Sequence, residues 1–408
     1  MTSPTPKKAR HSTANIAVIG AGWWSQGWHL PALHNNPRSN LVAIIDASSN
    51  PTSKLNPDLE SLSVLAKRYG TKTFNSIANL FDDMTIGPYL DGVLVATPHA
   101  THYVIGREIL KVINQRKKNN KKPLHILMEK PMTTDIEDAI NLYNLVEAET
   151  DGDSQFWINH SANYRVQTTI ARKAIASSRL GQIRHVTAYF ASPLKWIFFD
   201  PANEGWNKPT GNMIGNGFGW GQSSHLLAFI FHILPEIEPK NVFCRMTHSK
   251  ATGADVTHSA TIECLDLTTK EIVIISMSGT ALLPGNQYSS PPIAKLVQVD
   301  FYGDDGSLHY SGNDLSPSSG CLELKKSDGS SEVLHDRFEF EAYDNENYGP
   351  ESIQNFVELC CGGDDVPEAG ANVIDGLRSV QVLDAMYKSN ASKQSESIVS
   401  IKKTKNNE

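Results

Sequence analysis

The sequence predicts an α/β protein in which a doubly wound parallel sheet is followed by a second domain with a mostly antiparallel sheet. Three observations lead to this prediction. An apolar strand runs without a gap into a glycine turn at residues 20–22, strands and helices alternate up to about residue 150, and short alternating strands joined by turns dominate after residue 183. Alternation of strands and helices is typical of a parallel sheet, whereas runs of short strands are typical of an antiparallel one.

The composition indicates a globular protein that binds a small ligand. With 408 residues, 40% of them hydrophobic, the chain is long enough for about two or three domains. Lysine and arginine number 37 against 44 acidic residues, which gives a formal net charge of -7. Proteins that bind nucleic acids or membrane surfaces normally need a basic face, so this balance argues against both and favours a small neutral or polar ligand.

Cysteine usage and hydropathy indicate the compartment. None of the five cysteines forms a C-x-x-C pair, which favours a reducing environment. No run of about 18 apolar residues occurs, and residues 1–13 are polar and basic without the apolar segment of a signal peptide. We therefore expect a soluble, cytoplasmic protein with a disordered lead-in over residues 1–13.

The glycine turn has the features of a dinucleotide site. The strand Ile16–Ile19 is apolar throughout, Gly20-Ala21-Gly22 follows directly, and a helix is expected over residues 26–35. Gly20 permits the turn, and Gly22 lets the backbone approach phosphates whose charge is met by N–H groups at the helix start. The third position of G-x-G-x-x-G is Ser25, so an ordinary strand-to-helix turn remains the alternative. Trp23 and Trp24 follow Gly22 and are expected to line the pocket or to shield the pyrophosphate.

An acidic residue follows the second strand. The strand over residues 40–45 ends in Asp46, about 20 residues beyond the turn, where dinucleotide folds place a carboxylate on the adenosine ribose. A solvated acid at a strand end is the alternative. No arginine follows Asp46, and a carboxylate would repel a ribose 2′-phosphate, so the sequence favours NAD over NADP without excluding NADP.

The remaining strands and helices of the first domain follow in alternation. Helices are expected over 62–69, 77–81, 103–114 and 135–149, and strands over 72–74, 93–96 and 125–128. Because ligands bind beyond the carboxyl ends of parallel strands, we expect cofactor contacts from Ala96, Thr97, Pro98, His102, Glu129 and Lys130. The basic run over 116–122 is more typical of a solvated loop than of an anion site.

The residues described so far resemble a known family. Gly-Ala-Gly at 20–22, Asp46, Ala-Thr-Pro at 96–98 and Glu-Lys-Pro at 129–131 are similar, in order and spacing, to the Gfo/Idh/MocA oxidoreductases, named after glucose-fructose oxidoreductase, inositol dehydrogenase and rhizopine catabolism proteins. The resemblance covers roughly residues 14–390. It implies a Rossmann domain followed by an α/β domain whose open-faced sheet packs on a partner subunit, as a homodimer or homotetramer.

The second half of the chain is expected to consist mainly of strands. A strand over 155–160 and the segment Ser161–Arg165 resemble the opening of the family's second domain, in which Asn163 and Arg165 would contact substrate. We predict strands over 183–190, 242–247, 260–265, 271–278, 294–302 and 321–325, and helices over 167–177, 226–234, 352–360 and 371–389. The expected domains are 14–152 and 153–392, followed by a frayed polar tail over 393–408.

Lys130 is the first candidate catalytic residue. It stands at a strand end before a proline, where its side chain would reach the place at which nicotinamide and substrate meet. A cationic nicotinamide would depress the pKa of this lysine, which would then bind a substrate hydroxyl and help to move its proton. An ordinary surface lysine is the alternative.

His225 is the second candidate catalytic residue. It follows a glycine-rich segment over 215–221 and begins an apolar helix. In the family this segment usually reads Asp-x-Gly-x-His, with the histidine as general base; here Gly221 replaces the aspartate, and Gln222 is the nearest polar side chain in sequence. Without a carboxylate partner, His225 should be a weaker base. A histidine satisfied at a helix start is the alternative.

Tryptophans are dense between residues 192 and 221. Trp196, Trp206 and Trp220 accompany Lys195 in this segment, and aromatic faces suit the mixed surface of a sugar ring, although core packing explains tryptophans equally often. We expect Trp206 in the substrate site. No metal site is expected.

These residues predict an NAD(P)-dependent oxidoreductase that transfers a hydride between nicotinamide and a secondary alcohol or ketone of a sugar, cyclitol or related polyol. Two alternatives remain open. One is a dinucleotide-binding regulator without turnover, which the missing aspartate favours and the presence of Lys130 and His225 disfavours. The other is an oxidoreductase or glycosidase that uses its bound nicotinamide twice, without net redox change.

Overall fold

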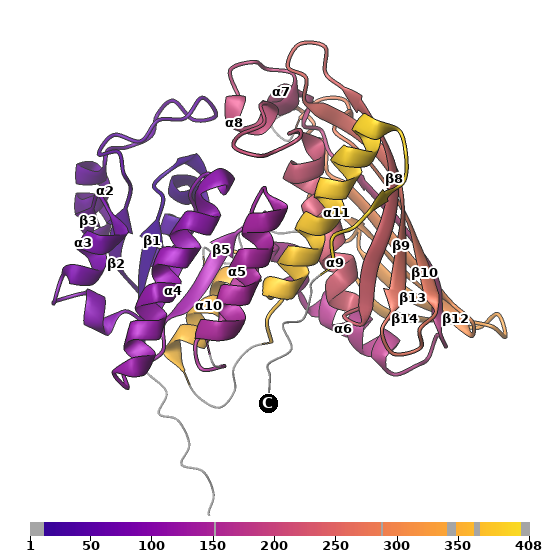
Figure 1. Ribbon diagram of the computed structural model, residues 1–408, viewed down its shortest axis with the longest axis horizontal. Coiled ribbons are helices and arrows are strands. Elements are labelled where there is room, and N and C mark those ends of the chain that lie inside the picture. Colours follow the sequence, from indigo (N-terminus) through magenta and orange to yellow (C-terminus); the bar gives the residue numbers. More distant parts are fainter. Residues whose placement is uncertain (1–11, 151, 287–288, 341–347, 363–367, 401–408) are drawn as a thin grey trace, which may run out of the picture. The chain divides into compact units, whose positions relative to one another are not determined.

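The computed structural model describes residues 12–150, 152–286, 289–340, 348–362 and 368–400 (Figure 1). The chain divides into two compact units, each with one sheet. Among the described residues, the first unit contains 12–133, 141–165 and 348–373, and the second contains 134–140, 166–340 and 374–400. None of the helices in these ranges is long and apolar enough to cross a membrane.

The sheet of the first unit is parallel throughout and has the strand order β3-β2-β1-β4-β5-β6. Its strands are β1 (Ala14–Ile19), β2 (Ser39–Ile45), β3 (Lys72–Phe74), β4 (Gly92–Val95), β5 (His125–Glu129) and β6 (Phe156–Asn159). The order reverses between β1 and β4, which is the switch point where doubly wound sheets bind ligands. The predicted doubly wound parallel sheet is confirmed.

Helices connect these strands and lie on both sides of the sheet (Figure 1). They are α1 (Leu30–Asn35), α2 (Leu62–Tyr69), α3 (Ile77–Asp82), α4 (His102–Lys118) and α5 (Ile136–Glu149), with single turns η1 (Ser25–His29), η2 (Gly87–Tyr89), η3 (His99–Thr101) and η4 (Ser161–Tyr164). Helix α4 continues past its predicted end at 114. The loop predicted from residue 116 is therefore wrong at its start, because the buried Arg116 guanidinium donates to the carbonyls of Leu90 (2.9 Å) and Gly87.

Helix α10 (Glu351–Cys361) packs on the parallel sheet although it comes late in the chain. A Cβ added at Gly92 of β4 would lie 2.4 Å from Cys360 Sγ and 2.8 Å from Phe356, so the helix rests directly on the strand backbone. The sequence predicts that 153–165 and this helix belong to the second domain. In the structure they lie in the first unit, because β6 pairs with β5 and Trp157 shares its core with Phe356.

The sheet of the second unit has the order β14-β13-β12-β11-β7-β10-β9-β8-β15. All neighbouring strands are antiparallel except β7 and β10, so the predicted mostly antiparallel sheet is confirmed. The strands are β7 (Ile183–Ala191), β8 (Ile237–His248), β9 (Asp255–Asp266), β10 (Ile272–Thr280), β11 (Leu296–Gly303), β12 (Gly306–Asn313), β13 (Cys321–Lys326), β14 (Ser331–Asp336) and β15 (Glu396–Ser397).

Strand β15 corrects the expectation of a frayed tail from residue 393. Glu396 and Ser397 pair with β8, and Ile398 is buried. The end of the predicted tail, residues 401–408, lies outside the described residues, as do residues 1–11 of the predicted lead-in.

Helices cover one face of this second sheet (Figure 1). They are α6 (Val166–Ala176), α9 (Ser224–Ile233) and α11 (Val373–Ser392), and α7 (Lys195–Phe198), α8 (Glu204–Asn207) and the π-helical turn η5 (Gly219–Ser223) precede α9. Phe229 of α9 packs on Tyr310 of β12 at 4.8 Å, and Ser389 of α11 accepts the Cys244 N–H of β8. Side chains alternate along each strand, so every second residue faces away from these helices.

Candidate active site

The glycine turn brings the ends of β1, β2 and β4 together. Gly20 has φ +102°, and a Cβ there would lie 2.4 Å from the Ala96 carbonyl oxygen, so only glycine fits. The Ala21 N–H donates to Asp46 Oδ2 at 2.8 Å, and Ser48 N–H donates to Asp46 Oδ1 at 2.9 Å. Asp46 therefore braces the turn, while each of its oxygens keeps a lone pair and the side chain stays half-exposed.

The space beyond the turn suits a dinucleotide. Among the described residues, none outside the chain neighbours of Gly22 has an atom within 4 Å of a Cβ added there, so the turn is open where phosphates would approach. Ser25 is fully buried, and its hydroxyl has no hydrogen-bond partner among the described residues. The open backbone at Gly22 and the half-exposed Asp46 carboxylate are the groups that would hold phosphate and ribose oxygens.

Three tryptophans follow the turn: Trp23 and Trp24 lie just before η1, and Trp28 lies on it. Trp24 and Trp28 stack at 4.2 Å, and Trp23 meets both edge-on at 5.3 and 5.5 Å. All three are half-buried. Trp23 and Trp24 are predicted from the sequence to lie at the pocket, but Trp28 is not, although its spacing of four residues from Trp24 could have indicated it.

The end of β4 is fastened to the segment after β5 by a buried histidine. His102 Nδ1 lies 2.8 Å from the Pro131 carbonyl oxygen, and its Nε2 lies 3.0 Å from the Thr97 carbonyl oxygen. Burial lowers the pKa of His102, and the two carbonyls and the Glu129 charge oppose that change. Nearby, burial and then the charges of His102 and Lys130 lower the pKa of His99 to about 4. Among the residues expected to contact cofactor, Ala96 and Thr97 are half-buried and Pro98 is exposed.

The Glu129 carboxylate at the end of β5 is bound by protein donors on both oxygens. His29 Nε2 lies 2.9 Å from Oε1, Asn159 Nδ2 donates to the same oxygen at 2.6 Å, and the Lys130 N–H donates to Oε2 at 3.2 Å. Lys130 itself is half-buried, and the Lys130–Pro131 peptide bond is cis. His29 and Asn159 are not among the residues predicted from the sequence, since nothing in their local pattern indicates a role in the site.

The two residues expected to contact substrate in the segment after β6 have different environments. Asn163 is buried, and neither its amide nitrogen nor its amide oxygen has a partner among the described residues. A buried amide normally satisfies both atoms, so Asn163 suits a ligand or water. Arg165 instead forms an ion pair with Glu351 of α10 at 3.3 Å, which gives it a structural partner.

In the second unit, the glycine-rich segment before His225 rests on a buried acid. Asp255 Oδ2 accepts the Gly219 N–H at 2.8 Å, and Oδ1 accepts the Tyr387 hydroxyl at 2.5 Å. Burial raises the pKa of Asp255, and these donors oppose that change. The Tyr387 ring leaves no room for side chains at Gly215 and Gly219. Asp255 was missed because a lone acid at a strand start carries no signal.

The residues around His225 form a π-helical turn that leads into α9. His225 and Gly221 are buried, and Gln222 is half-buried. A Cβ added at Gly221 would lie 3.3 Å from Phe198 and 3.5 Å from Trp206, so aromatic rings occupy the place of the family's usual aspartate. π-Helical turns inside helices are frequent at functional sites.

The other tryptophans of this region have different environments. Trp220 is buried and stacks on Tyr387 at 6.0 Å, which supports core packing for this residue. Trp206 and Trp196 are half-buried on α8 and α7. Across the described residues, no group of three His, Cys, Asp or Glu side chains is placed to hold a metal ion.

Two curated proteins are similar in sequence to parts of this chain. An uncharacterised oxidoreductase of Synechocystis is 27% identical over 133 residues, 32% of this chain and 29% of that protein. Glucose-6-phosphate 3-dehydrogenase of Bacillus subtilis is 24% identical over 206 residues, 49% of each chain. The matches thus span half or less of these curated relatives.

A solved structure extends the likeness of the fold to nearly the whole chain. The inositol dehydrogenase homologue of Azotobacter vinelandii, solved with NAD+, has a TM-score of 0.67 and 17% identity, covering 96% of this chain and 98% of that one. The model of the Gfo/Idh/MocA family, described as an oxidoreductase family with an NAD-binding Rossmann fold, matches residues 14–153. Residues 14–153 therefore match the Gfo/Idh/MocA oxidoreductases, and this part of the chain has the NAD-binding Rossmann fold that the family model describes.

Proposed function

We propose that this protein is an NAD-dependent oxidoreductase that interconverts a secondary alcohol and a ketone on a sugar, cyclitol or related polyol. The observation that carries the proposal is the placement of Lys130. It stands at the carboxyl end of β5, two strands from β1, in a segment held by Glu129 on one side and by His102 on the other. The bound nicotinamide would supply the hydride acceptor or donor.

The roles of the side chains follow from their chemistry. Lys130 would bind the reacting hydroxyl and assist its deprotonation, and neutral His225 would accept the proton. Asn163 and Gln222 would hydrogen-bond other hydroxyls, and the Trp206 face would pack against the C–H groups of the ring. Arg165 is left out of the substrate site, because its guanidinium is paired with Glu351.

The names of relatives support a polyhydroxylated substrate. One curated relative is a glucose-6-phosphate 3-dehydrogenase, and one structural neighbour is an inositol dehydrogenase homologue. The first name describes an enzyme that acts on a sugar, and the second describes a homologue of a cyclitol dehydrogenase, although pockets built on loops have no fixed code that identifies the ring.

The direct test is to screen a panel of sugars and cyclitols for NAD reduction by absorbance at the reduced-nicotinamide band. Net formation of free NADH supports the dehydrogenase. Product formation without free NADH would show the recycling alternative instead. If no compound reduces NAD while some bind and change NAD affinity, the regulator replaces the enzyme. For an active substrate, turnover should rise with pH as His225 loses its proton, and His225→Asn should flatten that rise.

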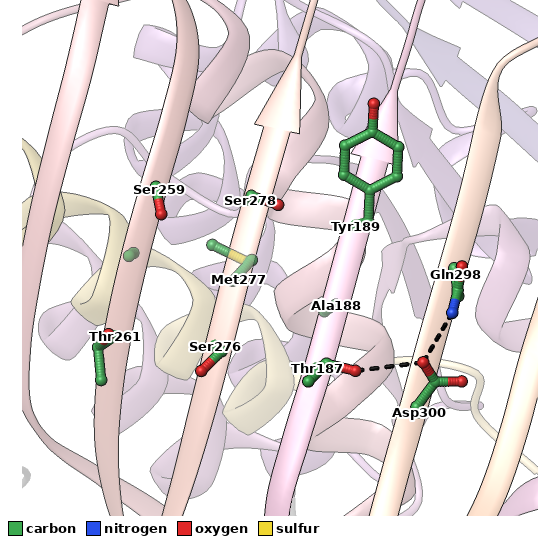
Figure 2. A pocket seen from close by; sticks show the side chains of 11 residues that line it. Thr187, Ala188, Tyr189, Ser259, Thr261, Ser276, Met277, Ser278, Gln298 and Asp300 are labelled. Carbon is green, nitrogen blue, oxygen red and sulfur yellow. Dashed lines mark hydrogen bonds between the residues drawn. The ribbon is translucent and has the colours of Figure 1, made fainter.

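The outer face of the second sheet suggests how copies of the chain associate. A hollow of about 400 Å³ lies on this face, lined by side chains of β7, β9, β10 and β11 (Figure 2). Asp300 at its edge accepts hydrogen bonds from Thr187 (3.2 Å) and Gln298 (2.8 Å). We propose that this face packs against a second copy, as a homodimer or homotetramer.

A further inference from the structure

Glu129 contacts two other segments of the first unit as well as the residue that follows it. Its Oε1 is bound by His29 from the turn after the glycine loop and by Asn159 from the end of β6, and its Oε2 is bound by the backbone N–H of Lys130. We propose that Glu129, held by His29 and Asn159, is a positioning residue that fixes Lys130 rather than a contact to the cofactor. This inference rests on the proposed role of Lys130.

Burial of these three side chains limits access of the cofactor to the Glu129 carboxylate. His29 is 2% exposed, Asn159 6%, and the Glu129 side chain 13%. A carboxylate has about four lone-pair sites, and protein donors occupy three of them here. Little acceptor capacity remains for a ribose hydroxyl, which is why the cofactor contact expected for Glu129 is replaced by a positioning role.

The carboxylate is held in its ionised form. Burial by itself raises the pKa of Glu129, but the His29 hydrogen bond, the charges of His29 and Lys130 and the Asn159 amide together bring it below its ordinary value. Hydrogen bonds to a charged acceptor are about twice as strong as neutral ones. The fixed negative charge therefore stabilises the Lys130 ammonium before a substrate proton is moved.

His29 also connects this network to the cofactor turn. It lies four residues after Ser25 on η1, and its ring meets Trp24 edge-on at 6.4 Å. Its Nε2 contacts Glu129, and its Nδ1 has no hydrogen-bond partner among the described residues. The contact between His29 and Glu129 thus joins η1, which follows the glycine turn, to the segment that carries Lys130.

Backbone hydrogen exchange tests the positioning role without any substrate. In the unmodified protein, exchange of the Lys130 amide should be slow, because Glu129 Oε2 accepts its proton. His29→Leu removes a donor to Glu129 and should speed this exchange about fivefold to tenfold, a range typical of one weakened hydrogen bond. His29→Gln keeps a donor and should preserve most of the protection. His34→Gln, an exposed position on α1, is the control and should change nothing.

Competitive acetylation tests the electrostatic part. In Glu129→Gln the ammonium of Lys130 loses a neighbouring charge, so the pH midpoint for acetylation should move down by about one unit. The exposed Lys118 in the same sample should keep its midpoint. If neither the Lys130 amide exchange nor this midpoint responds to the substitutions, the positioning role is wrong.

NAD titration separates positioning from cofactor contact. Glu129→Gln should bind NAD within about threefold of the unmodified protein; a loss beyond about tenfold would restore the cofactor contact and overturn the inference. With an active substrate, Glu129→Gln and His29→Leu should lower kcat more than they raise KM. Failure of the proposed function can be distinguished from failure of this inference. If Lys130→Met leaves turnover unchanged, the proposed role of Lys130 in catalysis is wrong. Amide exchange and acetylation still decide whether Glu129 positions Lys130.

Discussion

Lys130 is the single residue on which the proposed chemistry depends most. If it assists proton transfer, Lys130→Met should lower turnover by about 10²–10⁴-fold, the usual contribution of general acid–base catalysis. NAD binding should persist, because the glycine turn and Asp46 are untouched. Turnover and calorimetric NAD titration of the same preparation check both parts, with Lys118→Met as the surface control. A loss below about tenfold would show that another group does this work.

Asp46 should decide between NAD and NADP. Its charge would repel a 2′-phosphate, but it also accepts the Ala21 N–H, so Asp46→Ser changes the turn as well as the charge. Asp46→Asn keeps an acceptor and removes only the charge. We expect tighter binding of NAD than of NADP by the unmodified protein, and a preference reduced by about tenfold in Asp46→Asn. Calorimetry that finds tighter NADP binding by the unmodified protein would refute the assignment.

Among the elements, the π-helical turn η5 restricts which side chain can replace Gly221, four residues before His225. The family's aspartate cannot simply be restored, since a Cβ at Gly221 would lie 3.3 Å from Phe198 and a carboxylate beyond it would face aromatic rings. Gly221→Asp should lower the free energy of unfolding by about 1–3 kcal/mol and should not raise turnover. Gly205→Asp on α8 is the control, because nothing lies within 4 Å of its Cβ. A stable and faster Gly221→Asp variant would contradict this account; urea unfolding and turnover assays measure both.

The burial of His258, which lies on β9 beside η5, should make the free energy of unfolding depend on pH. His258 is 4% exposed, lies 3.4 Å from Ser223 Oγ, and burial lowers its pKa to about 4 from 6.5. Because the folded pKa is depressed, protonation favours the unfolded chain, so this contribution is complete above pH 6.5 and is lost as the pH falls towards 4. The shift corresponds to roughly 3 kcal/mol. Urea unfolding measured from pH 7 to 4.5 should show a smaller loss of the free energy of unfolding in His258→Gln than in the unmodified protein. If the free energies of the two proteins fall in parallel with pH, His258 is not the cause of the loss.

For the whole molecule, the helices and strands that have a clear local sequence pattern could be predicted from the sequence. Buried parallel strands are continuous apolar runs, and the predicted strand 72–74 and helix 62–69 match β3 and α2 in their bounds. Strand β12, with its polar sequence, was missed because a half-exposed strand has a weak pattern. The packing of α10 on Gly92 and the pairing of His29 with Glu129, 100 residues apart, depend on tertiary structure that no local pattern reports.

The assembly of the protein should depend on the outer face of the second sheet. Exposed apolar side chains on this face come from β7, β8, β10 and β11: Tyr189, Phe243, Ile272, Leu296 and Tyr302. A monomer rarely exposes so many on one face, and burying them against a second copy would remove apolar area from water. Tyr189 is 39% exposed beside the hollow of Figure 2.

Tyr189→Glu should therefore place an unpaired charge in the interface and weaken association by about a hundredfold or more. Light scattering after size-exclusion chromatography should show a dimer or tetramer for the unmodified protein and mainly monomer for this variant. Tyr89→Glu adds the same charge at a tyrosine that is 59% exposed in the first unit, and it should leave the assembly intact. An unmodified protein that remains monomeric at high concentration would refute the interface. If Tyr189→Glu assembles like the unmodified protein, association uses another surface, because an unpaired carboxylate buried between two sheets would cost several kcal/mol.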